Sequence, residues 1–201
     1  YEQWLTALPA DAMPHYLLAQ FYERTGFNGL AADQLGAYQS LSEGSLDMYA
    51  QAANLYRRLG MYEEEGFVLS QWLQEAPNSP EAHRLLADYY RRTGNYQAAV
   101  DEYQFLATLT PNNANVYLGT AQTFMQMGLY ADAQNAYLTA IELRPADLGI
   151  RLQLAQSFRR SGDLGAALET YQSVIDLGPA SPEAIRAARA VTQIQHQMNR
   201  A

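Results

Sequence analysis

Cysteine and lysine are both missing from this chain of 201 residues. Without cysteine the chain forms no disulfide and no thiolate zinc site, so the redox compartment stays open and cytoplasmic and periplasmic locations both fit. All 13 basic residues are arginine, which is typical of a GC-rich bacterial genome. No apolar run approaches the ~18 residues of a membrane span, and no signal peptide is visible, so we expect no membrane insertion.

Positive charge is scarce as well. The 13 arginines are outnumbered by 21 aspartates and glutamates, and the formal net charge is -8. Because nonspecific nucleic-acid binding depends on neutralising phosphates, this balance argues against a nucleic-acid partner. No phosphate-binding loop, zinc-ligand spacing or nucleophile elbow occurs, so we expect no enzyme activity, no catalytic residue, no metal and no cofactor.

What the chain does have is a period of 34 residues. Glycine recurs on this step at Gly26, Gly60, Gly94, Gly128 and Gly162. Proline recurs on the same step at Pro9, Pro77, Pro111, Pro145 and Pro179, and Glu43 stands in the single gap. Such a lattice indicates a repeat array, in which each unit contacts only its neighbours and the core is a continuous strip without a central cavity.

Within each repeat, numbered from Ala12 as position 1, small and large side chains keep fixed columns. Position 8 is always alanine: Ala19, Ala53, Ala87, Ala121 and Ala155. Position 11 is always aromatic: Tyr22, Tyr56, Tyr90, Phe124 and Phe158. Apolar residues at positions 4, 7, 8 and 11, and again at 20, 24, 27 and 28, follow helical spacing. The glycine at 15 ends the first helix and the proline at 32 blocks continuation of the second, so each repeat is predicted to be an antiparallel helical hairpin.

The repeat at residues 80–113 carries the fullest pattern: His83, Leu86, Ala87, Tyr90, Gly94, Tyr96, Ala99, Tyr103 and Pro111. This pattern resembles the tetratricopeptide repeat (TPR), which has the same length, and the resemblance extends over residues 12–181. It implies an all-α fold, a right-handed superhelical solenoid of tandem helix-turn-helix TPR hairpins. It also implies that the first helix of each hairpin lines a concave groove that binds a protein or peptide.

The register divides the chain into seven segments. Residues 1–11 are expected to be the end of a truncated preceding TPR unit. Five TPR units are expected at 12–45, 46–79, 80–113, 114–147 and 148–181. Residues 182–201 are expected to form a C-terminal capping helix, because Ser181 and Pro182 are typical of a helix start and Arg189 replaces the alanine of position 8.

Glu65 breaks the column of small residues at position 20, which otherwise holds alanine. A carboxylate facing Ala53 is costly unless it is paired or reaches water. One interpretation is a locally displaced helix with Glu65 at its edge, pairing with an arginine such as Arg84. The other is a bend that exposes a contact surface.

Two polar columns line the expected groove. Position 9 is rich in amides: Gln20, Asn54, Asp88, Gln122 and Gln156. Side-chain amides both donate and accept, as is needed to hold a peptide backbone, although any solvated helix face also carries such residues. Positions 12 and 13 are arginine pairs in three repeats: Arg57 and Arg58, Arg91 and Arg92, Arg159 and Arg160.

The arginine pairs allow two interpretations. They occupy the last turn of the first helix, where a cation favours the helix dipole and the free carbonyls. Alternatively they form a cationic rim that binds an acidic segment or a C-terminal carboxylate, because guanidinium forks suit carboxylates. The predicted partner-binding residues are Tyr16, Gln20, Asn54, Arg57, Arg84, Asp88, Arg91, Arg92, Gln122, Gln156 and Arg159. Tyr89 is a further candidate contact.

Two other readings of the groove find no support in the residues. The carboxylate clamp of some TPR proteins needs lysine at position 5 and asparagine at position 9, whereas the repeat with Arg84 at position 5 has Asp88 at position 9. His15 and His83 lie in the packing column at position 4, so a structural role is expected for both.

The predicted function is therefore a protein-protein interaction scaffold within a larger assembly. One alternative is a non-catalytic targeting or regulatory domain of a larger enzyme. Another is a structural spacer or self-association module that uses the outer face or the N-terminal edge. The partner, the pathway and the oligomeric state are not readable from these residues.

Overall fold

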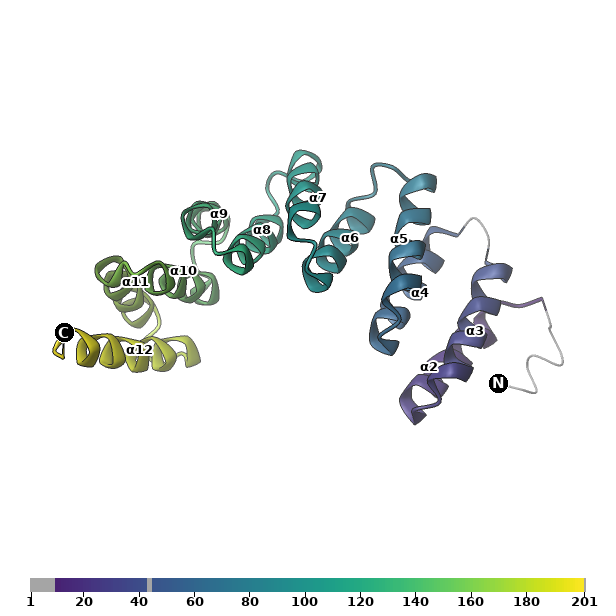
Figure 1. The fold of residues 1–201 in the computed structure, drawn as a ribbon, viewed down its shortest axis with the longest axis horizontal. Helices are drawn as coiled ribbons and strands as arrows, with labels where there is room; N and C mark the ends of the chain where they lie inside the picture. The colour runs from purple at the N-terminus through teal and green to yellow at the C-terminus, as the bar shows by residue number, and fades with distance from the viewer. Residues whose placement is uncertain (1–9, 43–44, 201) are drawn as a thin grey trace. The chain divides into compact units, whose positions relative to one another are not determined.

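The computed structural model describes residues 10–42 and 45–200, and within them the chain folds into helices joined by short turns, with no strand (Figure 1). The helices are α2 (Met13–Thr25), α3 (Asn28–Leu41), α4 (Leu46–Leu59), α5 (Tyr62–Glu75), α6 (Pro80–Thr93), α7 (Tyr96–Leu109), α8 (Ala114–Met127), α9 (Tyr130–Leu143), α10 (Leu148–Ser161), α11 (Leu164–Leu177) and α12 (Pro182–Met198). The predicted all-α fold class is confirmed. The segment expected at 1–11 falls almost entirely outside the described residues, as does Glu43.

Contacts divide the chain into two compact units, Tyr1–Tyr89 and Tyr90–Ala201. The division falls inside α6, so this helix contributes its first part to one unit and its last turn to the other. We call them the N-terminal unit and the C-terminal unit and describe each by itself.

The first helix of each hairpin ends at one of the glycines that recur every 34 residues. All five lattice glycines have positive φ, between 74° and 89°, and no other described residue does. At the end of α4 the Gly60 N–H donates to the Arg57 carbonyl at 3.2 Å, and the Met61 N–H donates to the Tyr56 carbonyl at 3.0 Å. A glycine reaches this left-handed conformation without a Cβ clash, so it both ends the helix and satisfies its last carbonyls.

Side-chain oxygens cap the N-termini of helices in the C-terminal unit. Asp147 accepts from the Ile150 N–H at 3.2 Å, Asp163 accepts from the Ala166 N–H at 2.9 Å, and Ser181 accepts from the Ala184 N–H at 3.0 Å. Each bond satisfies one of the donors that the first turn of a helix leaves unpaired. In this unit, side-chain caps therefore mark the starts of helices in the same way that the glycines mark the ends of the first helices.

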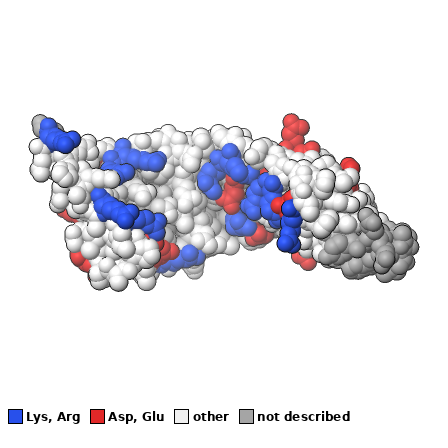
Figure 2. Space-filling view, turned by 90° about the horizontal axis from the view of Figure 1, so that it is seen from below, with Lys and Arg blue, Asp and Glu red and all other residues white. Residues whose placement is uncertain are grey.

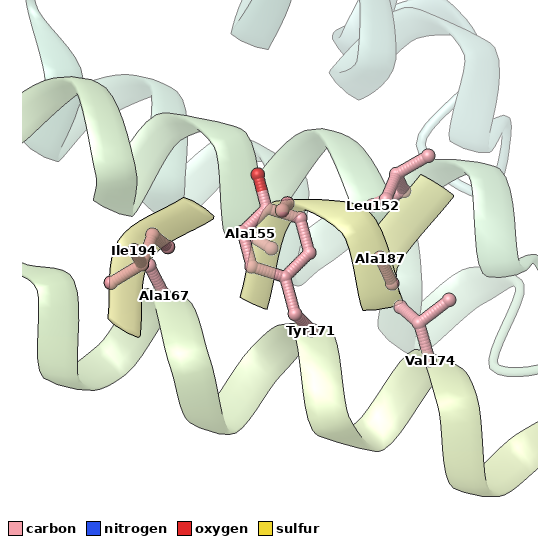
Figure 3. Packing of buried hydrophobic residues seen from close by; sticks show 8 residues of the cluster. Leu152, Ala155, Ala167, Tyr171, Val174, Ala187 and Ile194 are labelled. Carbon is pink, nitrogen blue, oxygen red and sulfur yellow. The ribbon is translucent and has the colours of Figure 1, made fainter. Parts of the chain in front are cut away.

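The core lies between the two helices of a hairpin and continues to the next hairpin. All five position-8 alanines are at most 2% exposed. In the C-terminal unit Tyr171 extends from α11 into the space bounded by Leu152 and Ala155 of α10 and by Ala187 and Ile194 of α12 (Figure 3). Alanine lets the backbones approach and the large ring fills the remaining volume, as close packing requires.

The prediction that Glu65 lies at the edge of its helix is wrong, whereas a local displacement of that helix stays a prediction. Helix α5 is continuous from Tyr62 to Glu75, and Glu65 is buried inside it with 3% of its surface exposed. The side chain lies in an acidic first turn with Glu63 and Glu64, where the positive end of the helix dipole favours a carboxylate. Pairing with Arg84, and a bend at this point, stay predictions.

Candidate functional site

Polar side chains join the first helices of successive hairpins. In the N-terminal unit Arg58 Nε of α4 donates to Glu23 Oε1 of α2 at 3.2 Å. In the C-terminal unit Gln122 of α8 donates to Gln153 of α10 at 3.0 Å, and Arg159 of α10 donates to Gln193 of α12 at 3.5 Å. The first helices thus lie side by side within each unit. We call their outward side chains the first-helix face, formed by α2 and α4 in one unit and by α8, α10 and α12 in the other.

In the N-terminal unit the predicted binding residues of this face are partly engaged in local contacts. The Tyr16 ring packs on Tyr38 of α3 with centroids 5.0 Å apart, and Gln20 is half-buried. Asn54 Nδ2 donates to the Ala50 carbonyl at 2.8 Å, and its Oδ1 accepts from Arg57 Nη2 at 2.9 Å. The amide of Asn54 therefore bonds within α4 through both its nitrogen and its oxygen, while the guanidinium of Arg57 remains exposed.

Arg84 lies between two acids on its own helix. Its Nη1 is 3.3 Å from Asp88 Oδ2, and its Nε donates to Glu81 Oε2 at 3.2 Å. These are i,i+4 and i,i+3 pairs on α6, of the kind that stabilises a helix surface by a few tenths of a kcal/mol. The three side chains together carry one net negative charge, so Arg84 and Asp88 do not form an anion site on their own.

In the C-terminal unit Gln122 and Arg159 each bond a neighbouring helix, whereas no side-chain bond of Gln156 is seen in the described residues. Gln122 is held by Gln153, which also accepts from the Tyr137 hydroxyl at 3.3 Å. Gln156 and Arg159 are exposed, and Arg160 beside them is exposed as well. An amide and two guanidinium groups therefore face solvent over the last two turns of α10.

The arginine pairs do occupy helix ends. Arg57 and Arg58 lie in the last turn of α4, and Arg159 and Arg160 in the last turn of α10. Yet in the described residues none of these four donates a hydrogen bond to a terminal carbonyl of its own helix; backbone N–H groups serve those carbonyls. Favourable interaction with the helix dipole remains, and each guanidinium is exposed, although Arg57, Arg58 and Arg159 each donate one hydrogen bond to a neighbouring side chain.

Arg91 and Arg92 form the third pair, in the last turn of α6, where Arg92 is exposed and Arg91 half-buried. Figure 2 shows that arginine side chains reach the surface in clusters, some of them beside acidic side chains. Tyr89, the further candidate contact, is half-buried, and its hydroxyl lies where a Cβ at Gly66 would meet it at 2.7 Å. Tyr89 thus packs on the backbone of α5.

Burial raises the pKa of two core tyrosines, Tyr137 and Tyr56. Burial raises the pKa of Tyr137 to about 12, against a smaller lowering by Arg160. Burial also raises the pKa of Tyr56, and the charge of Glu64 adds to this rise. Both shifts move the pKa of the phenol further above neutral pH. Both side chains therefore stay protonated and act as packing residues in the core.

The two histidines that the sequence places in a packing column make local contacts. His83 is 8% exposed, and its Nε2 donates to the Pro77 carbonyl at 2.8 Å. His15 Nδ1 lies 2.8 Å from Gln34 Oε1 of α3. Across residues 10–42 and 45–200, no three side chains of the metal-binding types gather into a site. Nor is any helix in this part of the chain both long and apolar enough to cross a membrane.

Sequence reasoning missed the glutamines that connect the hairpins. Gln153 accepts from Tyr137, and Gln51 accepts from the Tyr38 hydroxyl at 2.6 Å. Both glutamines stand at position 6, where other repeats have leucine or glycine. The polar residue at an otherwise apolar repeat position is the sequence signal that could have predicted these bonds.

Comparisons with known proteins agree with this architecture. The tetratricopeptide repeat family matches residues 47–114 and 118–182, more than half of the chain. No curated protein sequence matches. Among solved structures, MamA (41-end) from Desulfovibrio magneticus RS-1 superposes with a TM-score of 0.72 at 18% identity, over 85% of this chain and 97% of that one.

Two further structures extend the likeness. YrrB, described as a TPR protein with an unusual peptide-binding site, gives a TM-score of 0.66 at 16% identity, over 94% of this chain and 97% of that one. Yeast Tom70 gives 0.68 at 17% identity, over 98% of this chain and 42% of that one. Identities this low carry the fold alone, whereas the family match rests on the repeats themselves. The chain belongs to the tetratricopeptide repeat family.

Proposed function

We propose that this chain is a protein-interaction scaffold that binds a peptide or protein segment on its first-helix face. The observation that supports the proposal is the exposure of the arginine pairs at the ends of α4 and α10, which in the described residues donate to side chains or to none and not to the terminal carbonyls of their own helices. The description of YrrB as a TPR protein with a peptide-binding site supports the same use of the fold.

The chemistry of the exposed residues favours an acidic segment. A guanidinium presents a planar fork of donors that pairs with a carboxylate through two hydrogen bonds. Arg159 and Arg160 offer two such forks, and Gln156, one turn earlier, can hold a peptide group through its amide. A partner with a carboxylate near a free backbone amide would satisfy all three side chains together.

The remaining predicted residues have different weights in this proposal. Arg57 adds a cation to the N-terminal unit, Arg91 and Arg92 add cations at the end of α6 in the C-terminal unit, and Tyr16 and Gln20 supply half-buried contact surface. Asn54, Arg84, Asp88 and Gln122 position their neighbours through the local bonds described above. We therefore expect the largest losses of binding from the exposed arginines and smaller ones from the amides.

A direct test uses the double variant Arg159→Ala/Arg160→Ala and a fluorescein-labelled acidic peptide with a free C-terminal carboxylate. We expect about tenfold weaker binding by fluorescence anisotropy, the equivalent of about 1.4 kcal/mol, with little change in Tm. Arg144→Ala is the matched control, because Arg144 is exposed but lies at the end of a second helix, where it bonds Asn115. Unchanged binding with a lowered Tm would leave these arginines only a role at the helix end and would contradict the proposal.

A further inference from the structure

A furrow runs between the second helices α3 and α5 of the N-terminal unit. One hollow of about 560 Å³ is lined by Gly36 and Gln39 of α3, Met48 and Tyr49 of α4, and Phe67 and Glu75 of α5. A second hollow of about 380 Å³ adjoins it, since the two share Gln39 and Phe67. We call the two together the α3–α5 furrow.

The α5 side of the furrow is a regular stripe. Glu64, Phe67, Gln71 and Glu75 line it at spacings of three, four and four residues, so they share one face of the helix. The stripe has an acid at each end and an exposed aromatic ring between, with Phe67 63% exposed. From Glu64 to Glu75 the helix rises about 16 Å, which is three turns.

The stripe departs from the other hairpins at two columns. Position 22, where Phe67 stands, is polar in the other repeats: Asp33, Asp101, Asn135 and Glu169. Position 30, where Glu75 stands, is leucine in the other repeats: Leu41, Leu109, Leu143 and Leu177. The second hairpin thus has an apolar residue where the others are polar and an acid where the others have leucine, both on the same helix face.

The acids of the furrow have no cationic partner within the described residues. No arginine lines either hollow, and none of the ion pairs formed there involves Glu63, Glu64 or Glu75. Glu64 lies close enough to the buried Tyr56 hydroxyl to raise the pKa of that phenol. Three unpaired carboxylates around an exposed aromatic ring attract a cation by charge, and the ring face adds a cation–π contribution.

The walls of the furrow favour a helical occupant over an extended one. Both walls are helices whose backbone groups are bonded internally, so the furrow offers few main-chain partners. Gln39 and Gln71 offer an extended peptide side-chain amides at only two points of the furrow, whereas a helix satisfies all of its own backbone groups. The floor is packed: Tyr49 stacks on Trp72 with centroids 6.3 Å apart, and the Tyr56 hydroxyl donates to Gln39 at 2.8 Å.

We propose that the α3–α5 furrow is a second docking surface, which binds a basic amphipathic helix of a partner protein. Two arginine or lysine side chains about three turns apart pair with Glu64 and Glu75. An apolar residue between them packs on Phe67. The furrow thus selects a partner of opposite charge to the one proposed for the first-helix face.

The test measures the full chain against a labelled 18-residue helical peptide with arginines 11 residues apart and a leucine midway on the same face. Two analogues accompany it, one with glutamate for arginine and one with the arginines moved to the opposite face. We expect each analogue to bind at least tenfold more weakly. Equal binding of the glutamate analogue would overturn the charge assignment, and equal binding of the displaced analogue would overturn the spacing.

Variants of the furrow locate the binding. Phe67→Asn, which copies Asn135 of another hairpin, and Glu64→Gln/Glu75→Gln should each weaken binding about tenfold. Phe21→Asn is the matched control, because Phe21 is 52% exposed in the same unit but outside the furrow. Gly36→Trp should block the furrow and Gly36→Ala should not, since a Cβ at Gly36 meets nothing within 4 Å.

Two further outcomes decide the identity of the occupant. Circular dichroism and Tm show whether each variant is folded, and unchanged peptide binding by folded Phe67→Asn and Gly36→Trp would overturn the proposal. In sedimentation experiments without peptide, a dimer that Phe67→Asn abolishes would assign the furrow to a second copy instead. Arg159→Ala/Arg160→Ala should leave binding of the basic peptide unchanged, which separates this surface from the first-helix face.

Discussion

The two units fill one repeat column with different chemistry. Position 24 is leucine in the N-terminal unit, at Leu35 and Leu69, and tyrosine in the C-terminal unit, at Tyr103, Tyr137 and Tyr171. All five side chains are at most 2% exposed. The column therefore requires a large buried side chain, but it does not require an aromatic ring.

The tyrosines reach further than the leucines and so involve the next hairpin. The ring of Tyr103 packs on α8 at Gly119, where a Cβ would lie within 2.6 Å of the Tyr103 hydroxyl oxygen. Tyr137 donates to Gln153 of the next first helix. In the N-terminal unit a different residue, Tyr38 at position 27, makes the corresponding bond to Gln51. Both units thus have a tyrosine–glutamine hydrogen bond between successive hairpins, but the tyrosine comes from position 24 in one unit and from position 27 in the other.

The largest expected effects test whether tyrosine and leucine are equivalent as core residues. Tyr171→Ala should lower the free energy of unfolding by about 3–5 kcal/mol and Leu69→Ala by about 2–5 kcal/mol, because both leave a cavity in a packed core. Urea unfolding followed by circular dichroism measures both. Leu177→Ala, at a side chain 60% exposed, is the control and should cost less than about 0.5 kcal/mol. A cost below 1 kcal/mol at Tyr171 would mean that the column is not essential in the C-terminal unit.

The next largest effects concern one glycine in each unit, for which alanine substitution should change stability in opposite directions. Gly119→Ala should destabilise the protein by about 1–3 kcal/mol, because its Cβ would collide with the Tyr103 ring in a packed site. Gly36→Ala, on a helix of the N-terminal unit, should stabilise by about 0.5–1 kcal/mol, because the site is open and alanine favours the helix. Thermal denaturation of the pair provides the measurement. The same sign for both variants would refute the packing account of Gly119.

Alkaline pH should affect a tyrosine in this column. The pKa of Tyr137 is raised from 10.0 to about 12, so the unfolded chain ionises first. Its contribution to stability is complete below pH 10 and is lost as the pH rises from about 10 to about 12. Tyr137→Phe should remove this part of the loss, seen as a shallower fall of Tm between pH 10 and 12. An identical pH profile in the variant would show that this phenol is not the group responsible.

The smallest effect concerns the ion pair between first helices in the N-terminal unit. Arg58→Ala should cost no more than about 1 kcal/mol, because the Arg58 side chain is 43% exposed and its partner Glu23 is 21% exposed. The difference from wild type should shrink in 1 M NaCl, where surface charges are screened. In the C-terminal unit Gln122→Ala removes a neutral link of the same kind, so its effect should not depend on salt. A salt-independent Arg58→Ala would point to lost packing of the alkyl chain.

Much of the fold was predictable because the residues that define it act locally. Gly60 ends α4 through its own φ and its own N–H, whatever surrounds it. Ala53 signals a close helix contact through its size alone. The position of Glu65 was predicted wrongly for the opposite reason: its column predicts a small residue, and only the packed structure shows that a carboxylate is buried there inside the continuous helix α5.

The candidate site was predictable in residue type but not in availability. Gln156 is exposed, and no side-chain bond of it is seen in the described part of the chain. Gln122 has the same register as Gln156, yet it is held by Gln153 of the next hairpin. Register places a side chain on a face, whereas a partner residue from another hairpin decides whether that side chain is free to bind.

By itself, the sequence determined the repeat length, the glycines that end the first helices and the all-α fold, because glycine caps and buried alanines depend on residues within one or two turns. Only the tertiary structure decided which polar side chains are already engaged, where Tyr103 requires Gly119, and that α3 and α5 enclose an acidic furrow around Phe67. Those features depend on pairs of residues far apart in the chain, and their distances are set by how hairpins pack rather than by the period of the repeat.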